Sequence, residues 1–396
     1  MNTKWFTNPF FVYILGFLFV LIIYSLGWSD MYPALKWQIN LFLFIGFIPY
    51  FFLGFILEKK KRNEFRLIST SHKNAFIVAL LFFGYILEYL YGGGVPLIQT
   101  IRGGYSYKEF SGIPTFHVVL STFNLFYSIY LFHQYSSIRS KKTLFYFIIT
   151  VIFNLLVLNR GAIMITLIAC FFTYLMKLKK LRVIKLITIP GFVLLVIYLF
   201  GIIGNVRYSA SQDDKSFILR IGGASDKFIE SSIPPEYYWG YLYIATPIGN
   251  LQNIIVNSDI EFSFSKLPYF LATEPLPDFI AKRTGSLFEP AMPVDGERFL
   301  VSSALNAPTV YFRSFLLLGW TGIWLMYSYS ALVMLLYPFL LKKSSKYYVS
   351  GWVCLCAIIL LNVFSNMWQA TGTVLLWPLI LSAFEKIKLK NGPAKS

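Results

Sequence analysis

Long apolar runs alternate with short polar segments along most of this chain. A helix needs roughly 20 apolar residues to cross the hydrocarbon layer of a membrane, which is about 30 Å thick. Runs of about this length predict an all-α polytopic membrane protein with some ten transmembrane helices. The runs lie at 9–27, 39–57, 75–91, 114–134, 143–158, 161–176, 186–203, 317–341, 348–366 and 369–384.

The composition agrees with this pattern. Hydrophobic residues occupy 57% of the 396 positions and charged residues 13%, which is too little polar surface for a soluble domain. The first apolar run is too long for the core of a signal peptide, so we expect it to be a retained span. The three cysteines lie inside apolar runs, where we interpret them as small buried hydrophobic residues.

Basic residues concentrate in alternate connecting segments. These segments hold 22 of the 35 lysine and arginine residues and only three acids, Glu58, Glu64 and Glu385. Cytoplasmic loops of membrane proteins carry such an excess, so we expect both termini in the cytoplasm. The net charge of +17 is then a topology signal and does not indicate nucleic-acid binding. The expected organisation is seven transmembrane helices in 1–203, a large extracytoplasmic loop in 204–309, and three transmembrane helices with a basic cytoplasmic tail in 310–396.

One apolar stretch is long enough for either one helix or two, and the charge pattern decides between them. Residues 143–176 are apolar except at Asn159-Arg160-Gly161. A single tilted helix would put Lys141 and Lys177 on opposite sides of the membrane and break the charge pattern. We therefore predict a helical hairpin with Arg160 at its tip, near the outer headgroups.

The last large apolar stretch is too long for one straight span. Its cytoplasmic end is set by Lys342 and Lys343, so the helix is predicted to begin near Leu317. Tyr311 and Arg313 are then left at the outer interface. The preceding loop is rich in proline and aromatic residues, and we expect it to cover the helices as a lid that contains short helices, one of them an amphipathic helix within 216–233.

The expected outward face carries arginines that suit a phosphorylated substrate. A guanidinium stays charged and binds phosphate oxygens with two parallel hydrogen bonds. Arg160 is the most unusual, because it lies at headgroup depth. The alternative for each of these residues is an interaction with lipid phosphates or with loop acids. They are Arg102, Arg160, Arg207, Arg220, Arg283, Arg298 and Arg313.

Candidates for acid–base chemistry are less specific. A general base for a sugar hydroxyl is a carboxylate or a histidine, and the spacing selects none of the loop acids Glu236, Glu274, Asp278, Glu289, Asp295 and Glu297. Glu88 lies near the outer end of an apolar run, where a structural pair with a nearby arginine is expected. Among the histidines only His117 is expected near the outer face. No metal-ligand spacing and no nucleotide motif occurs, so we expect no metal and no cofactor.

Several segments resemble one family. They are residues 92–97 followed by Tyr107, Phe110, Gly112, Pro114 and His117; the turn at 159–161; residues 243–251; Pro275-Leu-Pro277; and Asn306 to Gly319 with Gly322. In these segments, and in their order, the chain resembles the Wzy-type O-antigen and capsular oligosaccharide repeat unit polymerases. The resemblance covers most of the chain from about residue 75.

This resemblance implies a metal-independent glycosyltransferase of the bacterial inner membrane, with its active site facing the periplasm. It would polymerise oligosaccharide repeat units linked to undecaprenyl pyrophosphate into O-antigen or capsular polysaccharide, and the lipid pyrophosphate would leave. A protein that regulates chain length is an expected partner beside the lipid bilayer. Arg160 and Arg207 are expected to stabilise the leaving group, with Glu297 as the catalytic carboxylate. The expected substrate-binding residues are Arg220, Arg313, Tyr243, Asn250, His117 and Tyr311.

Other functions fit parts of the pattern. A flippase for lipid-linked oligosaccharides is the main alternative, although transporters usually show two repeated halves and this chain shows none. The related O-antigen ligases carry a histidine near the end of the large loop, where this chain has Leu305-Asn306-Ala307-Pro308. An accessory protein of polysaccharide export is a third possibility. The sequence favours the polymerase.

Overall fold

The computed structural model describes residues 3–60, 63–103, 110–178, 217–288 and 295–390, with isolated positions between 188 and 202. Helices account for the regular structure of these residues, and no strand occurs among them. The only β-type pairing there is in isolated bridges, such as Ser29 with Ala224. The prediction of an all-α fold is confirmed for this part of the chain.

The helices coincide with the apolar runs of the sequence. Five segments of the described residues are long and apolar enough to cross a membrane: α2, α3, α7, α14 and Met367–Glu385. The predicted run 186–203 lies almost entirely outside the described residues, so the total of ten spans stays a prediction. The helices are α1 (Pro9–Tyr24), α2 (Trp37–Lys59), α3 (Asn74–Tyr91), α5 (Phe116–Ile138), α6 (Lys141–Leu156), α7 (Arg160–Lys177), α14 (Phe312–Leu340), α15 (Tyr348–Leu361), α16 (Met367–Thr371) and α17 (Leu376–Lys390).

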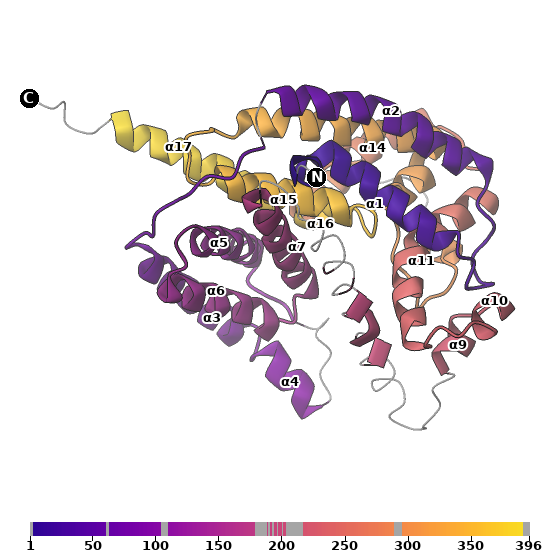
Figure 1. Ribbon diagram of the computed structural model, residues 1–396, viewed down its shortest axis with the longest axis horizontal. Helices are drawn as coiled ribbons and strands as arrows, with labels where there is room; N and C mark the ends of the chain where they lie inside the picture. Colours follow the sequence, from indigo (N-terminus) through magenta and orange to yellow (C-terminus); the bar gives the residue numbers. More distant parts are fainter. Residues whose placement is uncertain are drawn as a thin grey trace, which may run out of the picture.

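Helix α5 lies inside the bundle. It packs against α3, α6, α7 and α15, while α2 and α14 run side by side along the opposite edge of the molecule (Figure 1). Since α5 has little surface for lipid, it can carry polar residues. Asn124 donates a hydrogen bond to the carbonyl of Thr150, and Gln134 donates one to the carbonyl of Ser69. These bonds offset the cost of burying polar groups.

The basic segments meet at one end of the bundle. Arg66 donates a hydrogen bond of 2.6 Å to the carbonyl of Lys343, and Lys343 lies 3.4 Å from the carbonyl of Lys60. Lys177 donates to the carbonyl of Ser136. We call the end formed by Lys60, Arg66, Lys177 and Lys343 the basic end. Segments far apart in the sequence thus place their charges together, as the alternation of charge predicts.

The described part of region 204–309 holds the predicted short helices and, in addition, one long helix. It contains α11 (Glu236–Val256), which has 21 residues and packs against α1 and α14 (Figure 1). The aromatic residues that suggested a lid form its buried face. Burial raises the pKa of Tyr241 to about 12, so its hydroxyl stays neutral and accepts a hydrogen bond from the amide of Trp28.

One smaller prediction is corrected. The expected amphipathic helix within 216–233 is two short helices, α9 (Phe217–Ile221) and α10 (Asp226–Ile229). They are separated by Gly222 and Gly223, and the φ of +59° at Gly223 is favourable only for glycine. The backbone of α14 is non-helical at Leu318 and Gly319, so its long part begins just after them, close to the predicted start near Leu317. A short helical segment that starts at Phe312 precedes this break.

Candidate active site

A buried carboxylate on α3 binds a side chain of α5, at the end of the bundle opposite the basic end. Glu88 is fully buried, and its Oε2 lies 2.7 Å from Nδ1 of His117, whose side chain is 32% exposed. The amide of Ile113 donates to the other oxygen of Glu88 over 3.2 Å. The partner of Glu88 is therefore the histidine at the start of α5, and not the arginine that was expected.

The chain between these helices explains how the pair forms. Helix α3 ends at Gly92 and Gly93, and α5 begins after Thr115. A Cβ on Gly112 would lie 2.3 Å from Oε2 of Glu88. Only glycine therefore lets this segment pass so close to the carboxylate.

A second buried carboxylate lies directly after α12 (Leu267–Thr273). Glu274 is fully buried, and its Oε1 accepts a hydrogen bond of 3.0 Å from Nε of Arg313, whose side chain is 46% exposed. Asn366 donates to Oε2 of Glu274 over 3.2 Å and to its carbonyl over 2.9 Å. Because the ion pair uses Nε, the two terminal nitrogens of Arg313 can still bind an anion.

Helix α13 (Asp278–Gly285) forms hydrogen bonds to residues near both carboxylates. Arg283 Nη2 donates to the hydroxyl of Thr115, at the start of α5, over 3.0 Å. Thr284 donates to the carbonyl of Ala272, two residues before Glu274. The assembly combines two buried carboxylates with three cationic or basic side chains that reach the surface. We call it the glutamate end, and it consists of Glu88, His117, Glu274, Arg283 and Arg313.

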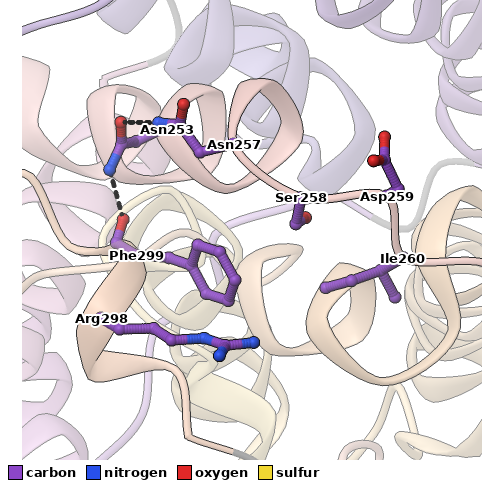
Figure 2. Close-up of a pocket in the computed structure, with 7 residues that line it drawn as sticks. All are labelled: Asn253, Asn257, Ser258, Asp259, Ile260, Arg298 and Phe299. Atoms are coloured by element: carbon purple, nitrogen blue, oxygen red, sulfur yellow. Dashed lines mark hydrogen bonds between the residues drawn. The ribbon is translucent and has the colours of Figure 1, made fainter.

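An open polar pocket of about 640 Å³ lies at the end of α11 (Figure 2). Asn253 donates to the carbonyl of Phe299, and Asn257 donates to Asn253. The guanidinium of Arg298 lies 4.6 Å from the centre of the Phe299 ring. Amides, a carboxylate and a guanidinium are the groups that bind sugar hydroxyls. We call this the amide pocket, and its lining is Asn253, Asn257, Ser258, Asp259, Ile260, Arg298 and Phe299.

A smaller cavity of about 160 Å³ lies between α9, α11 and the segment 304–307. Tyr243, one of the predicted substrate-binding residues, is 53% exposed and lines it. Arg220, another of these residues, is exposed and precedes Ile221 of the same lining.

The predicted catalytic residues do not all meet at one place. Arg160 is the exposed first residue of α7, next to Asn159, whose side chain accepts the hydrogen bond that starts the helix. Glu297 lies in the 3₁₀ turn η4 (Glu297–Phe299), directly beside the amide pocket. Arg207 lies outside the described residues. His117 and Arg313 belong to the glutamate end.

Two predicted substrate-binding residues make bonds within the protein. Tyr311 is fully buried and its hydroxyl is hydrogen-bonded to that of Tyr13. Asn250 is also fully buried. Its amide nitrogen donates to the carbonyls of Leu305 and Ala307, and its oxygen accepts from the amide of Val301. Asn250 thus fastens the segment 301–307 to α11.

We expect Asn250→Ala to destabilise the protein by about 2 kcal/mol, because three partly buried backbone groups lose their partner. The measurement is the melting temperature in detergent. Asn257→Ala is the control, since that side chain is exposed and bonds only Asn253 among the described residues. Equal melting temperatures for the two variants would contradict the structural role of Asn250.

Comparison with protein-family models, curated proteins and solved structures found no match to this chain. In the described residues, no three histidine, cysteine or carboxylate side chains are grouped so that they could hold a metal.

The structure also selects residues that the sequence did not. Glu274 was one of six equivalent acids, and Arg283 one of seven arginines. Nothing in the local sequence indicates the burial of Glu274, because its partners Arg313 and Asn366 come from distant segments. For Glu88 a signal existed: it and His117 stand on either side of the segment 92–113, which connects two neighbouring apolar runs.

Proposed function

We propose that this protein is a membrane-embedded glycosyltransferase that polymerises oligosaccharide repeat units linked to undecaprenyl pyrophosphate. It would produce O-antigen or capsular polysaccharide in the bacterial inner membrane. In this proposal ten helices cross the membrane, both termini are cytoplasmic, and the glutamate end faces the periplasm. One observation carries the proposal: buried carboxylates paired with partly exposed cationic or basic side chains lie at the end of the bundle opposite the basic end.

The reaction needs charge stabilisation at the leaving group. A hydroxyl of the acceptor attacks the anomeric carbon of the donor glycan, and the lipid pyrophosphate departs with the bonding electrons. Guanidinium groups stabilise the charge that develops on its oxygens. Arg313 suits this role, because Glu274 fixes the guanidinium through Nε while its terminal nitrogens remain for phosphate. Arg160 and Arg207 are proposed for the same charge, and Arg220 for binding.

The amide pocket supports a saccharide substrate. Its volume of about 640 Å³ is large enough for sugar residues, and its amide, hydroxyl and carboxylate groups can bind several hydroxyls. It lies beside α14, since the carbonyl of Ile260 approaches Gly319. Glu297 follows at its edge. A glycan that occupies this pocket would lie along the same helix that carries Arg313.

Arg160→Ala is expected to abolish long polysaccharide while single repeat units still form, because the leaving group loses a fixed positive charge. Arg160→Lys should restore part of the product, since it keeps the charge but loses the paired hydrogen bonds. The measurement is the length distribution of the polysaccharide on gels, with protein abundance determined in the same cells. Lys142→Ala, an exposed cation at the other end of the helical hairpin, is the control.

The lipid-linked intermediates of a deletion strain test the function itself. The expected result is the accumulation of a single repeat unit on its lipid carrier, exposed at the outer leaflet. Accumulation at the inner leaflet would instead indicate a flippase. A normal ladder of chain lengths in the deletion strain would contradict both functions.

A further inference from the structure

The hydrogen bond between Glu88 and His117 fixes which nitrogen of the imidazole faces the protein. Nδ1 is held at 2.7 Å by a carboxylate that is fully buried. A buried carboxylate that is not protonated must accept hydrogen bonds, so it favours the tautomer that carries hydrogen on Nδ1. Nε2 then has a free electron pair. Since the side chain of His117 is 32% exposed, this nitrogen belongs to a ring that solvent reaches.

The surroundings keep the ring in this position. Phe110 packs edge-on against the imidazole, with ring centres 5.9 Å apart. Gly112 leaves room for both side chains, because a Cβ there would lie 2.7 Å from Cγ of His117. The second oxygen of Glu88 is bound by the amide of Ile113, so the carboxylate cannot rotate without losing a bond. A partly exposed ring that is held in a fixed orientation, with one nitrogen able to accept a proton, is the arrangement that a general base requires.

We propose that His117 is the general base of the polymerase and that Glu88 is the residue that positions it. This inference rests on the proposed function. Nε2 of His117 removes the proton from the acceptor hydroxyl while the oxygen forms its bond to the anomeric carbon. The bond between that carbon and the pyrophosphate oxygen breaks, and the lipid pyrophosphate keeps the electron pair. The proton on Nε2 passes to water after the product has left.

The neighbouring cation is placed to assist this step. Arg283 is bonded to Thr115, two residues before His117. A guanidinium there can bind a phosphate oxygen of one of the two lipid carriers and hold the sugar beside the imidazole. The glutamate end would then supply the base from α5 and the anion-binding groups from α13 and α14. This division explains why polar residues from these three helices converge.

The test uses the full-length protein in detergent and the lipid-linked repeat unit extracted from a strain that lacks this protein. His117→Ala is expected to lower the rate of elongation roughly 100-fold or more, the usual contribution of a general base. Added imidazole should restore part of the rate, because it can occupy the vacated space and accept the proton. His72→Ala, an exposed histidine near the basic end, should elongate at the normal rate.

Glu88→Gln separates positioning from folding. Gln can still accept the hydrogen bond from Ile113 but no longer bears the charge that stabilises the protonated ring. We expect kcat to fall while KM for the lipid-linked repeat unit stays within about twofold, with an unchanged melting temperature. Imidazole should not rescue this variant, since the space is still filled by His117.

The outcomes separate the two proposals. If wild-type protein does not elongate the repeat unit, the proposed function fails. If wild-type protein elongates it and folded His117→Ala does so equally well, the general base is another group. Loss of activity in His117→Ala that imidazole never restores, at any concentration the wild type tolerates, would also overturn the proposal and leave His117 with a structural role.

Discussion

Replacement of Arg313 by alanine is expected to destabilise the protein by about 3 kcal/mol and to abolish polysaccharide elongation. Glu274 is fully buried, and Arg313 is its partner of opposite charge. Removing one partner of a buried ion pair leaves a charge without compensation, which costs more than the pair contributes. The figure is set at the low end of the usual range because the side chain of Arg313 is 46% exposed. The melting temperature in detergent and the polysaccharide ladder are the two measurements.

Two further variants separate stability from activity. Glu274→Gln combined with Arg313→Ala should recover most of the lost stability, since no buried charge remains and Asn366 still binds the side chain. It should not recover elongation, because the guanidinium that binds the leaving group is absent. A double variant as unstable as Arg313→Ala would contradict the ion-pair explanation. A double variant that elongates normally would exclude Arg313 from the reaction.

The sequence predicted most of the helices because lipid requires long apolar segments. The hairpin of α6 and α7 followed from charge alone, as Lys141 and Lys177 have to lie on the same side. Helix α11 was not predicted, since its buried face is aromatic and contains Pro247 and Asn250. Such a segment has the composition of a surface loop until its partner α1 is known.

The site was harder to predict than the fold. Arginine and acidic residues could be assigned to the outward face, but the pairs among them depend on contacts between distant segments. Arg313 and Glu274 are 39 positions apart, and Asn366 is 92 positions from Glu274. The pair of Glu88 and His117 was closer to prediction, because only 29 positions separate them. Tyr311 and Asn250 were predicted to bind substrate because they lie in segments that resemble the family. Both are buried and form hydrogen bonds within the protein instead.

Gly319→Ala is the second substitution with a large expected effect. The backbone of Gly319 has a φ of +57°, and a Cβ there would lie 2.4 Å from the carbonyl oxygen of Ile260. With a ψ of −143° this is a conformation that essentially only glycine adopts, and it costs alanine about 1 kcal/mol or more. The contact with a backbone atom forces α14 or the segment at Ile260 to move, at a further cost of about 2 kcal/mol. We expect a loss of about 3 kcal/mol, measured as a lower melting temperature in detergent.

Gly27→Ala is the matched control for this substitution. Gly27 has a similar φ of +63° but no atom within 4 Å of the position that a Cβ would take. It should lose only the conformational part, about 1 kcal/mol. Gly319→Ala should also slow elongation, because the break in α14 sets the position of its first turns, which carry Arg313, relative to Ile260 in the lining of the amide pocket. Equal stability of the two variants would contradict the close approach of Gly319 to Ile260. Normal elongation by Gly319→Ala would contradict the link between this approach and the site.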